Sequence, residues 1–228
     1  SLATHVKANL ATALIFYCEN SNEAWNNQPG FPVIPWLDAN RGALSRNAFW
    51  GAEMKKAFDY VTAVYSTELS RVRRIVMGDR ADSKFLYDPA AGTQGNLEFM
   101  DISRVDGVGF AAYFNVSPAD LTDYNNRLAP PNTDTSNDPT PAEVVMDAMR
   151  IITQNFGTAP SIATALSQHK VIADLFQKEL ILYELGDAIA FTGIEPPCAS
   201  IIRASHRAPE MFDAYELLMR QFSTYGVK

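Results

Sequence analysis

Apolar residues recur at intervals of three and four positions over long parts of the chain, which is the period of an amphipathic helix. The first such stretch runs from Leu2 to Tyr17 and leads into a polar turn at residues 19–22. The second covers residues 47–76, is long enough for two helices, and stops at Gly78. We therefore expect the first third of the chain to be helical.

Segments rich in proline, glycine and polar residues interrupt this helical pattern. Residues 26–38 place three prolines among aromatic and aliphatic residues, which predicts a loop anchored by buried side chains. Residues 78–96 are polar and turn-rich, and residues 105–116 carry an apolar run that periodicity leaves open between a buried helix and a strand. A short β-hairpin near residues 85–116 is the expectation for this part of the chain.

The clearest connector lies at residues 126–141, where a dense run of Pro, Asn, Asp and Thr cannot pack into a core. At its end, Thr140, Pro141 and Glu143 have the spacing of an N-cap, a first helical residue and a capping-box glutamate. This spacing predicts a helix that continues to Gly157.

Three further helical patterns cover residues 161–168, 170–185 and 209–222, with Gly186 as a C-cap for the second. The predicted fold class is therefore mainly α: a two-lobed helical core with a proline-rich connecting loop and the short β-hairpin. The predicted boundaries are an N-terminal lobe at residues 1–128, a linker loop at 129–139 and a C-terminal lobe at 140–228.

Composition is that of a globular protein with a core. The 228 residues are 47% hydrophobic and 20% charged, which fits one large domain or two small lobes and excludes a disordered tail, a coiled-coil rod and a collagen-like repeat. The formal net charge of -7 argues against a surface that binds nucleic acid or anionic lipid over its whole area. A local basic groove is compatible with that charge.

The two cysteines, Cys18 and Cys198, are far apart and belong to no CxxC pair, so a zinc knuckle and a redox motif are excluded. Cys18 lies in an apolar run, which predicts a buried thiol and an intracellular, reducing compartment. The first residues lack the basic region of a signal peptide, and the apolar runs are shorter than the roughly 20 residues that span a bilayer. We expect no membrane partner.

Motifs of catalysis are missing from the sequence: there is no P-loop, HExxH, GxSxG or EF-hand pattern. The three histidines, His5, His169 and His206, do not have metal-ligand spacing. Gly107 and Gly109 resemble part of a dinucleotide-binding turn, but without a clear strand before them they favour tight backbone packing. We expect a protein that is not an enzyme, although a site assembled from distant residues stays open.

Charge is concentrated in residues 41–84, which contain nine basic and five acidic residues. Within this segment, Arg71, Arg73 and Arg74 lie near a stripe of aromatic residues. Arginine forks onto phosphates and aromatic rings stack on unpaired bases, so the segment fits a site for single-stranded RNA. The alternative is a solvated basic face that is matched by acids of the same molecule or of a neighbour.

Three segments between about residues 10 and 155 have a distinctive composition. An early helix ends in a turn with a cysteine, Asn and Ser at residues 13–21, and a helix of aromatic and small residues follows at 56–65. A short aromatic segment at residues 109–116 comes after Asn96-Leu97 and residues 101–104. In this order the segments resemble the coat proteins of flexuous filamentous plant viruses, of the potyvirus and potexvirus type.

The resemblance implies a helical core with terminal arms that dock on neighbouring subunits, and a groove in which a Ser, an Arg and an Asp hold single-stranded RNA. Ser21 matches the serine of that groove. Ala52 and Ala112 stand where the family has the Arg and the Asp, so Arg46, Lys55 or Arg71 would supply the phosphate contacts instead.

We therefore expect a structural protein of the viral coat or nucleocapsid type that assembles with copies of itself and packages single-stranded RNA in a virion or in the host cytoplasm. The expected RNA-binding residues are Ser21, Arg46, Lys55, Lys56, Tyr60, Arg71, Arg73 and Arg74. No catalytic residue, metal ligand or cofactor is predicted.

Two alternatives stay open: a helical protein-interaction module that binds no nucleic acid, and an enzyme of a family that the motifs do not reveal. A pocket with His169 or His206 beside a carboxylate would favour the enzyme.

Overall fold

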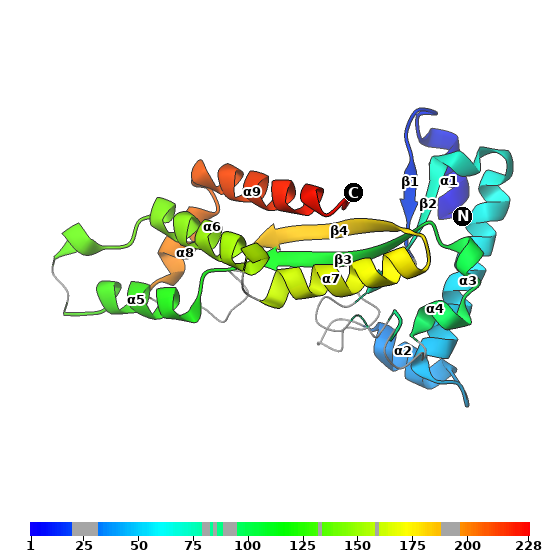
Figure 1. Cartoon of the computed structure of the whole chain (residues 1–228), viewed down its shortest axis with the longest axis horizontal. Coiled ribbons are helices and arrows are strands. Elements are labelled where there is room, and N and C mark those ends of the chain that lie inside the picture. The colour runs from blue at the N-terminus through cyan, green and yellow to red at the C-terminus, as the bar shows by residue number, and fades with distance from the viewer. Residues whose placement is uncertain are drawn as a thin grey trace. The chain divides into compact units, whose positions relative to one another are not determined.

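The computed structural model describes residues 1–19, 32–78, 83, 86–88, 95–131, 134–157, 160–187 and 197–228. Contacts divide the chain into two compact units. Unit 1 comprises residues 1–111, residues 165–183 and Lys228, and unit 2 comprises residues 112–164 and 184–227. Figure 1 shows the elements of the chain, coloured from the N-terminus to the C-terminus.

Four strands form a curled parallel sheet in the order β1-β2-β3-β4, so their order in the sheet follows their order in the chain. The strands are β1 (Phe16–Cys18), β2 (Val72–Gly78), β3 (Gly107–Phe114) and β4 (Glu179–Asp187). The register pairs Phe16 with Val72 and Ile75 with Gly107. Each connection between neighbouring strands contains at least one helix, as parallel pairing requires.

This α/β architecture shows that the prediction of a mainly α fold with a short β-hairpin near residues 85–116 is wrong. The apolar run within 105–116 is β3, and it pairs in parallel with β2, which a hairpin arm cannot do. Seven of its eight residues are buried. A strand that is covered on both faces carries no polar alternation, which is why the sequence pattern did not separate it from a buried helix.

The second strand, β2, occupies the end of the stretch predicted to be helical over 47–76. Val72 and Val76 are spaced as in a helix, but α3 (Arg46–Tyr65) has already ended. Ser66 has a φ of 31°, outside the right-handed helical region, and a 3-10 turn, η1 (Ser66–Arg71), leads into the strand. The helix therefore ends because of the backbone conformation of Ser66, which the spacing of apolar residues does not predict.

The fourth strand, β4, occupies the second part of the stretch predicted to be a helix over 170–185. The first part of that stretch and the helix predicted at 161–168 form one helix, α7 (Pro160–Leu175), and Gln177 then turns the chain with a φ of 56°. Gly186 lies inside the strand, so it is not the helix C-cap that the sequence predicted.

The first helix is shorter than predicted, because α1 (Leu2–Asn9) ends at Leu10, which is extended, and β1 follows. Part of the predicted loop at 26–38 is a helix, α2 (Val33–Asn40). Pro35 lies in its first turn, where the missing N–H of a proline costs no helical hydrogen bond. Residues 26–31 and most of the turn predicted at 19–22 lie outside the described residues.

The core of unit 1 is built on α3. Ser45 caps this helix by accepting a hydrogen bond from the N–H of Ala48 at 3.1 Å. Phe58 and Tyr65 on its inner face are fully buried, and burial of each ring contributes about 2–3 kcal/mol. In Figure 1, α3 lies beside α1 and beside the short helix α4 (Asn96–Phe99), both of which contact it.

Two glycines let side chains of β2 and β4 lie directly over β3. A Cβ atom at Gly107 would be 2.7 Å from Cδ1 of Ile181, and one at Gly109 would be 2.3 Å from Sδ of Met77. Both distances are too short for ordinary contact, so the neighbouring side chains occupy the space that larger residues would need. The prediction that these glycines serve tight packing is confirmed.

Unit 2 contains α5 (Pro118–Leu128), α6 (Pro141–Gly157), α8 (Ala199–Ser205) and α9 (Glu210–Thr224), and α6 packs against α8 and α9. The predicted start of α6 is confirmed, since the N–H of Glu143 donates to Oγ1 of Thr140 at 3.1 Å. The helix predicted at 209–222 corresponds to α9. Residues 129–139, predicted to link two lobes, connect α5 to α6 within this unit.

Ionic hydrogen bonds join α5 to α6. Arg127 donates to both carboxylate oxygens of Glu143, at 2.6 and 2.8 Å, and the hydroxyl of Tyr124 donates to Asp147. The bond from Arg127 is the largest cause that lowers the pKa of Glu143 below its ordinary value. A bidentate arginine fixes the relative orientation of two helices better than a single contact does.

Replacement of Gly51 by alanine tests the close contact of α3 with α4. In a helix interior this change normally stabilises by about 1 kcal/mol. Here a Cβ atom would lie 2.6 Å from the backbone oxygen of Asn96 and 2.9 Å from Cβ of Phe99. We expect Gly51→Ala to lower the free energy of unfolding by about 1–3 kcal/mol, because the backbone of α4 must move.

Urea unfolding followed by tryptophan fluorescence measures this change, because both tryptophans of the described residues, Trp36 and Trp50, belong to unit 1. Ala63→Gly, on the exposed side of the same helix, is the reference and is expected to cost about 1 kcal/mol. A Gly51→Ala protein more stable than the natural sequence would contradict the contact.

Candidate functional site

The cations predicted to bind RNA form ion pairs within the chain. All six have a carboxylate oxygen within 4.0 Å. The pairs are Arg46–Asp38, Lys55–Asp59, Lys56–Glu53, Arg71–Glu68, Arg73–Glu179 and Arg74–Asp106. Three of the partner acids lie outside residues 41–84, so acids from other parts of the same molecule offset most of the positive surplus of that segment. Ser21, Arg80 and Lys84 lie outside the described residues.

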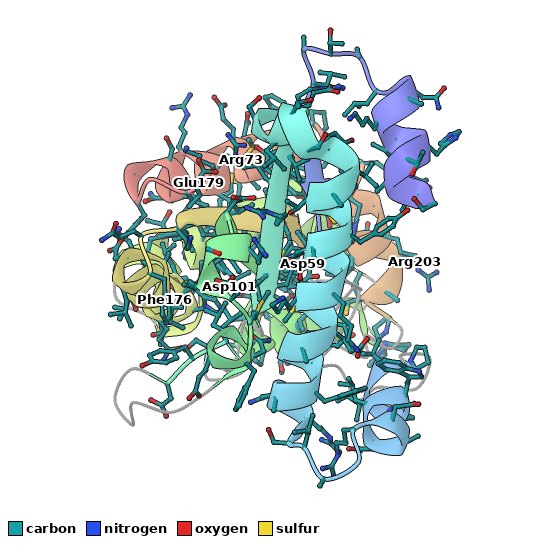
Figure 2. The ribbon with its side chains drawn as sticks, turned by 90° about the vertical axis from the view of Figure 1, so that its right-hand side faces the viewer. Asp59, Arg73, Asp101, Phe176, Glu179 and Arg203 are labelled. Atoms are coloured by element: carbon teal, nitrogen blue, oxygen red, sulfur yellow. The ribbon has the colours of Figure 1, made fainter. Side chains whose placement is uncertain are left out.

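Arg71 and Arg73 connect different elements of unit 1. Arg71 donates to the backbone oxygens of Leu10 and Ala11, at 2.9 and 3.3 Å, and so holds the turn that follows α1. Figure 2 shows the side chains of Arg73 on β2 and Glu179 at the start of β4 next to one another, with 3.7 Å between nitrogen and oxygen. Both arginines serve the packing of unit 1.

Arg74 makes the most extensive of these contacts. Its Nε and one terminal nitrogen donate to the two oxygens of Asp106 at 2.8 and 2.9 Å, and its backbone N–H donates to the same carboxylate at 2.8 Å. Another guanidinium nitrogen donates to Oγ1 of Thr62 on α3 at 3.1 Å. The Arg74 side chain is only 12% exposed. A guanidinium held in this way orders β2, β3 and α3 and leaves little surface for a phosphate.

Two of the predicted RNA-binding residues, Lys56 and Tyr60, instead line a pocket in unit 1, which we call the aromatic pocket. Its volume is about 790 Å³. Its walls come from α1, β1, α2 and α3. Pro32, directly before α2, and Glu19, directly after β1, also line it. The lining residues are Ser1, Leu2, Ala3, Phe16, Cys18, Glu19, Pro32, Val33, Trp36, Trp50, Glu53, Lys56, Ala57, Tyr60 and Val61.

One face of α3 forms the longest wall of the aromatic pocket. Trp50, Glu53, Ala57 and Tyr60 follow one another at intervals of three and four residues, which places them in a row along a helix. Ala57 has the smallest side chain in this row and stands between two long ones. The small side chain of Ala57 therefore leaves space that forms part of the pocket.

Three rings that line the pocket have partners that fix their positions. Trp36 packs against Phe49 with 5.5 Å between ring centres, and Phe16 stacks on Tyr65 at 6.0 Å. The hydroxyl of Tyr60 donates to Oγ of Ser1, which caps α1, and this bond lowers the pKa of Tyr60. Rings with such fixed partners provide a preformed wall.

The charged side chains among the described residues that line the aromatic pocket are Glu19, Glu53 and Lys56. Nζ of Lys56 pairs with Glu53, and Glu19 lies on the opposite wall after β1. Burial, and after it the charge of Glu19, raise the pKa of the Cys18 thiol to about 11. Cys18 is therefore a protonated thiol near neutral pH, and its wall of the pocket disfavours additional negative charge.

A second, smaller pocket of about 380 Å³ also lies in unit 1. It is lined by Tyr17, Cys18, Glu19, Ile75, Met77, Ile181, Leu182, Tyr183 and Lys228. No histidine is among the described residues that line either pocket. His169 is fully buried, stacks on Phe110 at 5.1 Å, and has Nδ1 2.7 Å from the oxygen of Ala165, so it belongs to the core of unit 1.

Within the described ranges, no three His, Cys, Asp or Glu side chains are grouped as metal ligands. In the same ranges, no helix combines the length and the apolar character that a membrane span needs. No family model, curated protein or solved structure matches the chain. The resemblance to viral coat proteins, the RNA-packaging function, the intracellular location and the absence of enzymatic activity stay predictions.

Sequence reasoning missed most of the aromatic pocket. The sequence predicts Trp36 to be an apolar anchor of a loop, and it does not single out Trp50, Glu53 or Ala57 as site residues. The row of Trp50, Glu53, Ala57 and Tyr60 was a usable signal, because two aromatic residues flank an alanine on one helix face. The walls from α1, β1 and α2 depend on contacts between distant residues, for which the sequence holds no local sign.

Alanine substitutions separate structural from surface cations. We expect Arg74→Ala to lower the free energy of unfolding by about 2–4 kcal/mol, because it leaves the partly buried Asp106 without its main partner. Lys56→Ala removes an exposed pair and is expected to cost less than about 0.5 kcal/mol. Urea unfolding of unit 1 by tryptophan fluorescence gives both values, and similar small losses would contradict the role of Arg74.

The same pair predicts a dependence of stability on pH. Burial would raise the pKa of Asp106, but the hydrogen bonds from the side chain and backbone of Arg74 outweigh burial and lower it. A lowered pKa in the folded state stabilises the protein above the unfolded value of about 3.9, and this stabilisation is lost as the pH falls through the folded value. We expect Asp106→Asn to flatten the decrease in unfolding free energy between pH 5 and pH 2.

Unfolding curves at several pH values in this window measure the slope. Arg74→Ala should flatten it as well, and the double variant should add little to either single change, because both remove the same interaction. Parallel pH profiles for Asp106→Asn and the natural sequence would show that another carboxylate dominates.

Proposed function

We propose that the chain is a binding protein that holds a small, largely apolar ligand in the aromatic pocket of unit 1. The observation that carries this proposal is the pocket itself: an open hollow of about 790 Å³ whose described lining is mainly aromatic and aliphatic, with charged side chains at Glu19, Glu53 and Lys56. Ligand sites in proteins typically have volumes of about 300–1,000 Å³ and this mixture of an apolar wall with a few polar groups.

The exposure of the rings supports the same proposal. Trp36 is 44% exposed and Tyr60 is 49% exposed, although Trp36 packs against Phe49 and Tyr60 is hydrogen-bonded to Ser1. Aromatic rings that are partly exposed to water and lie close together raise the free energy of the unoccupied protein. A ligand that covers these rings removes their apolar surface from water, and this burial favours binding. A ligand with an aromatic or branched apolar body fits this surface.

The structure also explains why the basic segment is the weaker basis for a function. Binding RNA at Arg71, Arg73 or Arg74 would require these side chains to exchange partners inside unit 1, including the two carbonyl groups and the carboxylate that Arg71 and Arg74 hold. Ligand binding in the aromatic pocket requires no such exchange.

Filling the pocket from within tests the proposal. Ala57→Phe places a ring in the middle of the α3 wall, and we expect it to weaken binding of the neutral dye N-phenyl-1-naphthylamine by at least about tenfold, since the dye and the new ring compete for the same volume. Titration of the dye, followed by its own fluorescence and by tryptophan emission from Trp36 and Trp50, measures the dissociation constant.

Ala63→Phe is the matched control, because Ala63 is exposed on the same helix and does not line the pocket. It should bind the dye as the natural sequence does. Circular dichroism of both variants confirms that each is folded. Failure of the natural protein to bind the dye, or equal binding by both variants, would refute the proposed function.

A further inference from the structure

We propose that two copies of the chain join the edges of their sheets and close an eight-stranded parallel barrel. In this dimer, β4 of each copy pairs with β1 of the other, so the order of the strands continues through both chains. The inference goes beyond the proposed ligand site, because it concerns the concave face and the two edges of the sheet. It is drawn from unit 1, which contains β1, β2 and the beginning of β3 and of β4.

The curl of the sheet brings its two edge strands to one hollow. In a flat sheet of this order, three strand spacings would separate β1 from β4 by about 14 Å, and no hollow would lie between them. Here both strands line the second pocket, of about 380 Å³, to which β1 contributes Tyr17 and Cys18 and β4 contributes residues 181–183. This pocket is therefore the inside of a half-closed barrel.

The inner face of this half-barrel is built from apolar side chains. Ile75 of β2 and Ile181 of β4 both lie over Gly107 of β3, where a Cβ atom would be 2.9 and 2.7 Å from their Cδ1 atoms. Both isoleucines are buried, whereas Tyr17 at the edge is 54% exposed. Parallel sheets occur almost only where both faces are covered, so this partly covered inner face calls for a further layer of side chains.

The outer edge of β4 accepts a parallel strand. Lys228 occupies one position there: its N–H donates to the oxygen of Leu180, and its own oxygen accepts from the N–H of Leu182, both at 3.0 Å. Two such bonds, one on each side of Ile181, are the pattern of parallel pairing. In the closed barrel, β1 of the second copy takes this place and forms a longer ladder than the single residue does.

The outer edge of β1 lies among exposed apolar side chains. The order of the sheet places β1 at its edge, with β2 as its paired strand among the described residues. Leu14 and Ile15, shortly before β1, are 53% and 41% exposed and add to the exposed surface of Tyr17. An exposed apolar edge is a template for pairing with another chain. Because Tyr17 also lines the second pocket, a strand that pairs with β1 covers the edge and the hollow together.

A second copy of the chain is the partner that satisfies both edges at once. Since β1 and β4 run in the same direction, a twofold axis along the barrel places each β4 beside the β1 of the other copy. All strands of the dimer are then parallel, and eight strands enclose an interior that side chains just fill. A single foreign strand would pair with one edge and leave the other open.

Sedimentation of the natural protein over about a thousandfold range of concentration measures the dissociation constant of the dimer. We expect Tyr17→Lys to raise this constant at least about a hundredfold, because the closed barrel would bury an ammonium group from each copy. Leu44→Lys is the matched control, since Leu44 is 49% exposed and lies between α2 and α3, outside the sheet and the second pocket. It should change the constant less than about threefold. Circular dichroism of dilute samples confirms that both variants are folded.

Hydrogen exchange of the natural protein tests the closure without any substitution. Dilute and concentrated samples are compared, and amides of β1 and of β4 should both exchange at least about tenfold more slowly in the concentrated sample. Amides of α3 serve as the internal reference and should exchange equally in both samples, because the edges of the sheet do not include them.

Three results would overturn the barrel. They are a natural protein that stays monomeric over the whole range, a dimer that Tyr17→Lys leaves intact, and a dimer that protects only one of the two edge strands. The last result contradicts the proposal because closure needs both edges. None of these measurements involves a ligand, so their failure is distinct from a failure of the dye to bind in the aromatic pocket.

Discussion

The ion pair of Arg74 and Asp106 is the interaction on which the architecture of unit 1 depends. Asp106 stands directly before β3; its N–H donates to the backbone oxygen of Arg74, and its own backbone oxygen accepts from Glu179 at the start of β4. One residue therefore aligns three of the four strands. A partly buried guanidinium is tolerated only when its donors are satisfied, and here the carboxylate of Asp106 and the hydroxyl of Thr62 accept from it. The arrangement explains why a strand of this sheet contains adjacent arginines.

Such contacts between residues that are distant in the sequence decide how much of the fold the sequence could predict. Helices with local signals were predictable. The capping residues before α6 mark where that helix begins, and the apolar period of α9 marks the extent of that helix, so neither prediction needs information from distant parts of the chain. The strands depend on distant partners. β2 can contain Arg73 and Arg74 because Glu179, at the start of β4, and Asp106, directly before β3, pair with them. These polar residues among apolar ones make the sequence of β2 resemble that of an amphipathic helix. The conformations of Ser66 and Gln177, which end α3 and α7, have no counterpart in periodicity.

The candidate site shows the same division between local and distant information. Electrostatics acts between neighbours in space, and most of the positive surplus of residues 41–84 is offset once Asp38, Asp106 and Glu179 join them from other segments. A sum over a stretch of sequence therefore overestimates the net positive charge that its side chains present in the folded protein. Lys56 and Tyr60, which the sequence selects for their charge and their ring, both line the aromatic pocket. What sequence reasoning lacked was the hollow at Ala57 and the rings of α2 and β1 that face it across the chain.

A stable core requires aromatic side chains to be buried, whereas a preformed pocket in unit 1 requires some of them to stay exposed. The sheet and the inner face of α3 are closely packed around Phe58 and Tyr65, whereas Trp36 and Tyr60 keep about half of their surface in water. The packed part holds the rings in place, so the unoccupied pocket does not collapse to cover them, and their exposure lowers the stability of the free protein. A ligand that binds only the folded state returns this free energy in proportion to the logarithm of its concentration. The stability of unit 1 and the occupancy of the pocket are therefore one linked equilibrium, in which the ion pairs of Arg71, Arg73 and Arg74 maintain the scaffold and the ligand completes the packing.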